Sequence, residues 1–411
     1  MEKRVPIFAP ALMAIVVDAM GFGLVYPLMT ELFAGEEGLH MAAGLSLGLR
    51  HFYLGLSFLL YPLAAFFGAP LMNDLSDKYG RKQVLTLCMA GQTVSFLMMG
   101  AGVGFFNIAV LLVGRALSGI MAGSQPIAQA AIIDHATLHN RTRHLAVVTA
   151  VIAAGIVIGP LIGGIFSDEL LVGWFRLSTP FYIAAALALL TTLWVWTSFP
   201  KRAAAKRPHQ SLQWTRPASI LKEGFTNSRT RSLAVVFLCM QIGFSVFFQL
   251  IQVFVSVVYD YSTWQIGVFN GYIGIAFALV VLFGIKFFLK RLPVEKLASF
   301  ALLMTGICLI LPMLYPLEVF VWVMVFLAAG FNMVAFGSLM ACFSQSVDEA
   351  HQGWAMGLFG AIVAATWAVT GLTTNLIGFV GLRWLISIGG LFLLFSYYLM
   401  VRRNALSDSK N

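Results

Sequence analysis

The sequence predicts an all-α integral membrane protein in which twelve transmembrane helices form two six-helix bundles. Two observations support this prediction. Of the 411 residues, 60% are hydrophobic and only 10% are charged, whereas soluble domains carry about 25% charged residues. The hydrophobic residues also gather into runs of roughly 20, the length that an α-helix needs to cross a bilayer. Lipid must therefore surround most of the folded chain.

The predicted helices follow these runs in order, six before a polar segment and six after it. We expect the first six near residues 6–33, 51–73, 83–105, 106–135, 143–168 and 176–199, and the second six near 231–259, 263–290, 295–315, 317–345, 353–379 and 382–402. The domains then are an N-terminal bundle (1–199), a basic cytoplasmic linker (200–230) and a C-terminal bundle (231–411). Within the linker, Ser219 to Phe225 is a candidate amphipathic helix on the membrane surface.

Basic residues lie mainly in alternate loops and predict the orientation of the chain. One side holds the clusters, such as Lys78 to Lys82 and the linker. The other side has the basic residues Arg50, Arg176 and Arg383 and the acids Glu31, Glu36, Glu37, Asp168, Glu169, Asp260 and Glu318. The positive-inside rule therefore places both termini in the cytoplasm. The short loops are typical of a protein of the bacterial inner membrane.

Several function classes are disfavoured by composition. The net charge of +9 does not indicate a nucleic-acid partner, because the basic residues are divided among short loops. The four cysteines (Cys88, Cys239, Cys308 and Cys342) lie in apolar runs without CxxC spacing, so we expect neither a disulfide nor a metal site. We find no HExxH pattern, no Walker phosphate loop and no deep nucleophile–histidine set. We therefore expect no enzyme activity and no cofactor other than a coupling proton.

Two ionisable side chains lie deep in the predicted membrane region. Asp18 is about 11 residues into the first helix, roughly 17 Å, and Arg115 is about nine residues into the fourth helix from the other side, roughly 14 Å. Both therefore lie near the midplane of a core ~30 Å thick. A low-dielectric surrounding disfavours a carboxylate, so Asp18 is the candidate proton carrier, with a proton affinity that depends on its distance from Arg115. The alternative is a static ion pair that fixes helix packing.

Uncharged polar residues form a stripe on each of two predicted helices, at helical spacing. The candidate cavity residues are Ser118, Gln125 and Gln129 on the fourth helix, Gln241, Gln249 and Gln252 on the seventh, and the aromatic residues Tyr26 and Trp367. Such residues could line a substrate cavity. Hydrogen bonding between helices uses the same residue types, so both interpretations stay open.

The run Asn73-Asp74-Leu75-Ser76-Asp77-Lys78-Tyr79-Gly80-Arg81-Lys82 follows the second predicted helix. An acid followed by a basic turn can latch onto neighbouring helix ends, and breaking the latch would accompany opening. The run resembles the G-x-L-a-D-r-x-G-r-k signature of the major facilitator superfamily. Asp77, Gly80, Arg81 and Lys82 match it, whereas Asn73 replaces its first glycine.

Glycines recur at four-residue spacing in the fifth predicted helix, in the run Gly155-Ile-Val-Ile-Gly159-Pro160-Leu-Ile-Gly163-Gly164. Such spacing leaves a bare groove for a neighbouring helix, and Pro160 removes a backbone hydrogen bond and permits a kink. The run resembles the G-x-x-x-G-P-x-x-G-G signature of the antiporter branch of the same superfamily. Five matches at this spacing make the signal specific.

Further motifs narrow the resemblance. The run Asp18-Ala-Met-Gly21-Phe-Gly23-Leu-Val-Tyr26-Pro27 looks like a stretch of tetracycline/proton antiporters and related drug exporters. Arg115 followed by Gly119 resembles their helix-four motif, whose arginine is implicated in proton coupling. Ala131-Ile-Ile-Asp134 resembles the end of the same helix. We therefore predict Asp18, Arg115 and Asp134 as proton-coupling residues.

The resemblance covers the whole chain and implies the major facilitator fold, with two pseudo-symmetric bundles and alternating access. It implies a monomer in lipid that exports small organic or amphipathic molecules, as in multidrug or tetracycline efflux, by inward proton flow. The C-terminal half has no deep acid by this placement, so we expect neutral, zwitterionic or weakly charged substrates.

Two alternatives stay open. The protein could carry a metabolite or siderophore, by export or by proton-symport uptake. The antiporter glycines argue against uptake, but fold alone does not decide direction. The second alternative is a membrane-embedded enzyme or sensor, and detection of chemical turnover would support it.

Overall fold

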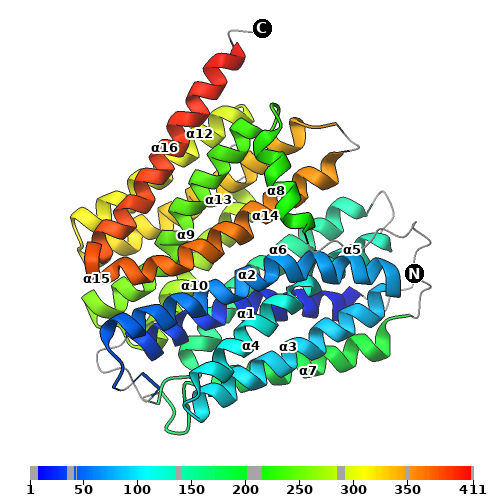
Figure 1. Ribbon diagram of the computed structural model, residues 1–411, viewed down its shortest axis with the longest axis vertical. Coiled ribbons are helices and arrows are strands. Elements are labelled where there is room, and N and C mark those ends of the chain that lie inside the picture. Colours follow the sequence, from blue (N-terminus) through cyan, green and yellow to red (C-terminus); the bar gives the residue numbers. More distant parts are fainter. Residues whose placement is uncertain are drawn as a thin grey trace. The chain divides into compact units, whose positions relative to one another are not determined.

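The computed structural model describes residues 8–34, 41–42, 44–135, 140–169, 171–200, 215–284, 292–348 and 351–408 (Figure 1). All regular secondary structure within these residues is helical. Twelve helical spans of the described chain are long and apolar enough to cross a membrane. The predicted all-α membrane fold is therefore confirmed.

The first six spans begin with α1 (Phe8–Ala34), α2 (Leu47–Tyr79) and α3 (Arg81–Gly104) and end with α6 (Arg141–Ile165) and α7 (Thr179–Ser198). Between them, the span Ile108–Asp134 consists of α4 (Ile108–Ile120), the 3₁₀ turn η1 (Met121–Gly123) and α5 (Ser124–Asp134). The prediction of one regular helix over residues 106–135 was therefore wrong at this turn. Pro126 explains it, because proline cannot donate a backbone hydrogen bond to the carbonyl of Ala122, four residues earlier.

The linker contributes α8 (Arg216–Thr226), which contains the predicted amphipathic segment. The second six spans are formed by α9 (Arg231–Tyr259), α10 (Thr263–Leu279) with the π-helical η2 (Val280–Gly284), α12 (Val294–Leu314), α13 (Glu318–Gln345), α14 (Gln352–Gly371) with η4 (Leu372–Leu376) and α15 (Ile377–Val380), and α16 (Leu382–Asp408). Residues 201–214 of the predicted linker and both chain ends lie outside the described residues.

The basic run after the second span is more helical than predicted. We expected the second helix to end near residue 73, but α2 continues to Tyr79 and α3 begins at Arg81. The only residue between them is Gly80, whose φ of 99° lies in the region that favours glycine. The polar residues from Asn73 to Lys78 suit a helix that extends beyond the apolar layer.

Residue contacts divide the chain into two compact units. Unit 1 contains residues 1–45, 60–214 and 261–271, and unit 2 contains residues 46–59, 215–260 and 272–411. Two of the boundaries thus fall inside helices, one in α2 and one in α10, whereas the predicted bundles, 1–199 and 231–411, follow chain order. The reason lies in local contacts: Gly267 packs on Gly164 within unit 1, and Thr374 donates a 3.0 Å hydrogen bond to the carbonyl of His51 within unit 2.

Unit 1 is organised around the contact between α1 and α6, in which the predicted glycine groove receives α1. A Cβ atom added at Gly155 would lie 2.6 Å from Cβ of Ala19, and one at Gly163 would lie 2.6 Å from the carbonyl oxygen of Leu24. Gly164 faces the start of α10 instead, where an added Cβ would lie 2.8 Å from Cα of Gly267. The groove therefore brings three helices to backbone contact.

Unit 2 is organised around α9, whose membrane span is the most buried of the twelve found in the described chain. It packs against α14 and α16, and α12 packs against α13 and α16. A small-residue contact recurs here, because a Cβ atom added at Gly389 of α16 would lie 2.8 Å from the carbonyl oxygen of Gly243 in α9. Small residues thus set the closest helix approach in this unit as well.

The glycine groove can be tested by adding one methyl group. In Gly159→Ala the new Cβ would overlap the carbonyl oxygen of Met20 and lie 3.0 Å from the backbone nitrogen of Leu24. We expect a loss of ~1–3 kcal/mol, as for other overpacked cores, measured by thermal unfolding in detergent. Gly360→Ala in α14 is the control, because an added Cβ there meets nothing within 4 Å. Equal melting temperatures for the two variants would contradict the close approach.

Candidate functional site

The candidate proton carrier, Asp18, lies in the middle of α1 with only 5% of its surface exposed. Its Oδ1 atom accepts a 2.7 Å hydrogen bond from the Ser124 hydroxyl, at the start of α5. The same oxygen accepts a 3.2 Å bond from Nε2 of Gln92 in α3. The buried carboxyl group is thus held by two neutral donors, as is usual for buried polar groups.

Gln92 connects this carboxyl group to α4. Its Oε1 atom accepts a 2.7 Å hydrogen bond from the Ser118 hydroxyl, and its Nε2 atom also donates to the Ser118 carbonyl at 3.3 Å. The amide is therefore held on both sides, which fixes the direction of its donor toward Asp18. The result is a buried hydrogen-bond network that spans α1, α3, α4 and α5.

The 3₁₀ turn η1 allows both serines to join this network. In a regular helix at 100° per residue, Ser118 and Ser124 would point about 120° apart. The three residues of η1 turn by about 120° each instead of 100°, which reduces the angle between Ser118 and Ser124 to about 60°. The glycines beside the turn let α2 approach, since a Cβ atom added at Gly119 would lie 2.7 Å from Cβ of Ala64.

Arg115 lies in the same unit but has a different environment. Only 1% of its surface is exposed, and its guanidinium carbon lies 5.1 Å from the ring centroid of Tyr61. This is the geometry of a cation–π contact. Tyr61 in turn packs on Phe22, which packs on Tyr26 of the predicted cavity. The described residues show no ion pair between Asp18 and Arg115, so the two charges are held by separate partners.

The predicted latch residues meet where α2 ends and α3 begins. Arg81 forms a 2.9 Å ion pair with Asp77 and a 3.5 Å contact with Asp134 at the end of α5. Its Nη1 atom also donates a 2.6 Å hydrogen bond to the Ser76 hydroxyl. The guanidinium therefore joins three helix ends of unit 1, and it links Asp134 to the latch, away from Asp18.

Lys82 extends the latch to α7. Its ammonium donates a 2.6 Å hydrogen bond to the Phe199 carbonyl, at the end of α7, and lies 5.9 Å from the Trp196 ring centroid. A cation is favourable at this position, because helix C-termini carry partial negative charge. The turn at Gly80 brings Arg81 and Lys82 to different partners.

The predicted cavity residues are distributed over both units. Tyr26 and Ser118 are buried in unit 1, Gln125 and Gln129 are half-buried on α5, and Gln241, Gln249 and Gln252 are buried on α9, with Trp367 half-buried on α14. Gln249 donates to the Trp367 carbonyl at 3.2 Å, and Gln252 donates to the Phe248 carbonyl at 3.1 Å. In this structure these two amides bond to helix backbones. Their role in a cavity stays a prediction.

Sequence reasoning did not select Gln92 or Ser124, the two donors to Asp18. Neither residue is ionisable, and Ser124 lies off the polar stripe that a regular fourth helix would have. Tyr61 was one of many aromatic residues without a distinguishing pattern. The sequence does contain a signal for Gln92, which is a large amide in the middle of an otherwise apolar span. Such a group needs a hydrogen-bond partner within the membrane.

Comparisons with known proteins identify the family of this chain. A family model described as Major Facilitator Superfamily matches residues 11–371. The class C tetracycline resistance protein of Escherichia coli is 28% identical over 364 residues, which cover 87% of this chain and 85% of that protein. The class H tetracycline resistance protein of Pasteurella multocida is 27% identical over 380 residues, which cover 88% and 85%.

A solved structure supports the fold independently. The inward-facing, occupied structure of a bacterial homolog to the human lysosomal transporter Spinster superposes with a TM-score of 0.77. The match covers 98% of this chain and 97% of that chain, at 14% sequence identity. At this identity the similarity concerns the fold alone.

The Gln92 network can be tested through stability. Gln92→Leu removes the partner of the Ser118 hydroxyl and one donor to Asp18, and we expect a loss of about 1–2 kcal/mol in thermal unfolding. Thr93→Val is a neighbouring control, because the Thr93 hydroxyl bonds only within its own helix, to the Met89 carbonyl at 2.9 Å. A Gln92→Leu protein as stable as Thr93→Val would show that the network contributes nothing to stability.

Proposed function

Because this chain belongs to the major facilitator superfamily, we propose that it is a proton-coupled exporter of small organic or amphipathic molecules, of the tetracycline type. The chain is an integral membrane transporter. The proposal concerns its coupling ion, the direction of transport and its substrate. The observation that supports them most directly is the buried Asp18 carboxyl group with its two neutral donors. Intramembrane acids are costly and are functional by default.

The Ser124 contact suits a group that gains and loses a proton. A serine hydroxyl can donate to a carboxylate, and it can rotate to accept from a protonated carboxyl group. Gln92 is held by Ser118 and remains a donor in both states. Asp18 can therefore change protonation without leaving a buried polar atom unsatisfied. In the proposed cycle it takes up a proton from outside and releases it into the cytoplasm as alternating access exchanges the two sides.

Arg115 supplies a fixed positive charge in the same unit. Its contact with Tyr61 stabilises the guanidinium without neutralising it, since a ring face has no net charge. A rearrangement that shortens the distance to Asp18 would favour the carboxylate and release the proton. Proton affinity would then follow conformation, as antiport requires.

The charges of unit 2 and the names of the relatives support the proposed substrate class. The described acids of unit 2 lie at helix ends or in α8, as for Asp260, Glu295 and Glu318. A dicationic substrate would have no deep counter-charge there, so neutral, zwitterionic or weakly charged molecules are favoured. The names of the curated relatives concern tetracycline resistance, which makes tetracycline the first substrate to test. The basic loops support a bacterial inner membrane with both termini in the cytoplasm, and we take a monomer as the working state.

The role of Asp18 is tested by Asp18→Asn in proteoliposomes, with tetracycline added and internal pH followed by a trapped dye. We expect substrate-driven proton movement with the original chain and background movement with the variant, because the amide cannot carry a proton. Asp260→Asn is the matched control: its side chain is exposed and its φ of 55° is one that asparagine tolerates.

The other possible results of this experiment each lead to a different conclusion. Coupling that survives in Asp18→Asn would make Asp18 structural and move the carrier to Asp134 or Asp77. Proton movement of opposite sign would make the protein a symporter. No response to tetracycline or to a wider drug panel, with a folded protein, would contradict drug export.

The cation–π contact is tested by a pair of substitutions at Tyr61. Tyr61→Leu removes the ring face beside Arg115, a contact worth about 2 kcal/mol when desolvated, so we expect coupled transport to fall about tenfold or more. Tyr61→Phe keeps the face, and we expect less than about a twofold change. The measurement is the initial rate of proton movement. Equal loss in both variants would assign the role to the Tyr61 hydroxyl instead.

A further inference from the structure

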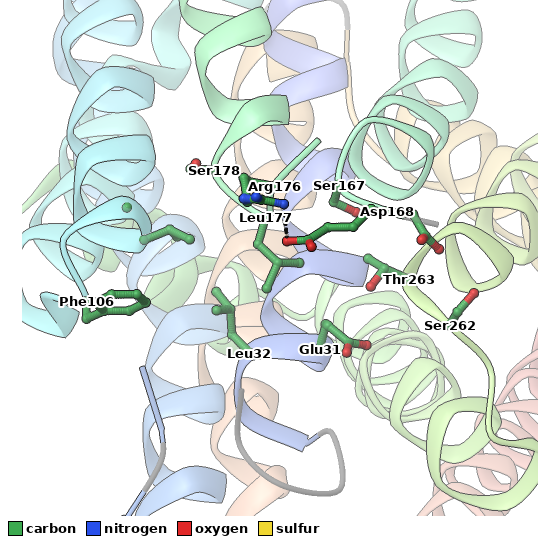
Figure 2. A pocket seen from close by; sticks show the side chains of 13 residues that line it. Glu31, Leu32, Phe106, Ser167, Asp168, Arg176, Leu177, Ser178, Ser262 and Thr263 are labelled. Carbon is green, nitrogen blue, oxygen red and sulfur yellow. Dashed lines mark ion pairs between the residues drawn. The ribbon is translucent and has the colours of Figure 1, made fainter. Parts of the chain in front are cut away.

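A second candidate site lies within unit 1, at the end of α1 that is remote from the latch. A cavity of about 790 Å³ is lined there by the end of α1, the α3–α4 loop, the α6–α7 loop and the start of α10 (Figure 2). Small-molecule sites commonly enclose about 300–1,000 Å³. Glu31 in its wall is 13 residues beyond Asp18 along α1, about 20 Å away at 1.5 Å per residue. The cavity is therefore separate from the proton-coupling network.

The wall of this cavity carries excess negative charge. Among the described lining residues, the ionisable ones are the acids Glu31, Asp168 and Glu169 and the base Arg176. Arg176 pairs with Glu169, and both side chains are more than half exposed, so this pair forms the rim. Asp168 is only 8% exposed and belongs to the inner wall. The described part of the wall therefore has three carboxylates and one guanidinium, a balance that favours a ligand with positive charge.

Hydroxyl groups at the start of α10 are a separate observation that points to a bound ligand. Thr263 lines the cavity with 6% of its surface exposed, and its hydroxyl takes part in none of the side-chain hydrogen bonds of the described residues. Figure 2 shows it between Asp168 and Glu31. The neighbouring residue Ser262 also lines the cavity, and its hydroxyl oxygen is buried without a hydrogen-bond partner in the described chain. Buried polar groups without partners are rare and call for an explanation, such as a ligand.

The chemistry of the described wall favours an organic molecule. In the described chain, no three His, Cys, Asp or Glu side chains gather closely enough to hold a metal ion. Much of the remaining lining is apolar, including Leu32, Val103, Phe106 and Leu177. A ligand that matches both parts has a charged donor group and an apolar body.

We propose that this cavity binds a small organic molecule that carries a protonated amine. The ammonium group lies against Glu31 and Asp168 and donates to the Thr263 hydroxyl, and the apolar body lies against Leu32 and Phe106. The positive-inside rule predicts this end of unit 1 to be outside the cytoplasm, so the ligand enters from outside. This binding needs no proton gradient and does not depend on the proposed export function.

The test uses dansylcadaverine, a fluorescent primary amine, and its N-acetylated analogue, which has the same apolar body without the charge. Both are titrated into purified full-length protein in uncharged detergent. We expect saturable binding of the amine, and affinity for the acetylated analogue that is lower by at least about tenfold, the effect of losing a charged hydrogen bond. Equal affinity for both, or no saturable binding of the amine, would overturn the proposal.

Variants then locate the site and move affinity in opposite directions. Glu31→Gln and Thr263→Val should weaken amine binding, the first by about tenfold, with little effect on the acetylated analogue. Arg176→Gln removes the basic residue among the described lining residues and should strengthen amine binding, a gain that a misfolded protein cannot produce. Asp260→Asn, outside the cavity, should bind as the original chain does.

The same assay separates this proposal from proton-coupled export. Asp18→Asn should retain amine binding even if it abolishes coupled transport. A chain that transports normally but binds the amine unchanged in Glu31→Gln and Arg176→Gln would overturn the cavity proposal and leave the export function intact. Binding that follows the expected order in a protein without substrate-driven proton movement would support the cavity and contradict the export function.

Discussion

A carboxyl group buried in the middle of a membrane-spanning bundle is the constraint on which the arrangement of unit 1 depends. Lipid offers no hydrogen-bond partner, so the donors to Asp18 must come from neighbouring helices. Ser124 and Gln92 provide them at 2.7 and 3.2 Å. These contacts require α1, α3 and α5 to lie close together. The glycines of α6 allow α6 to pack onto α1 as well, because a side chain at Gly155 would collide with Ala19.

The irregular turn in the fourth span is a consequence of the same requirement. A regular helix would direct Ser118 and Ser124 to different neighbours, whereas η1 lets both take part in one network. Pro126 and the adjacent glycines make this turn accessible at low cost, since they weaken the helix at that position. A local departure from ideal geometry thus supports a buried polar site, as is common for 3₁₀ segments within longer helices.

The two ends of unit 1 have opposite charge character. At one end Arg81 and Lys82 hold the ends of α2, α5 and α7 together through carboxylates and a backbone carbonyl. At the other end the described lining of a cavity contains three acids and one basic residue. The positive-inside rule accounts for the difference in basic residues. It does not explain why a cavity forms at the acidic end, which depends on how four chain segments meet there.

The sequence by itself determined the helical class, the twelve spans and the family, because apolar runs of membrane length and glycines at fixed spacing are local properties of the chain. It also selected Asp18 and Arg115, since charge deep in an apolar run is visible without a structure. Only the tertiary structure decided which side chains satisfy Asp18, that Asp134 joins the latch, and that Glu31, Asp168 and Thr263 share one cavity. These relations join residues far apart in sequence, and the angles that bring them together depend on helix packing and on one irregular turn.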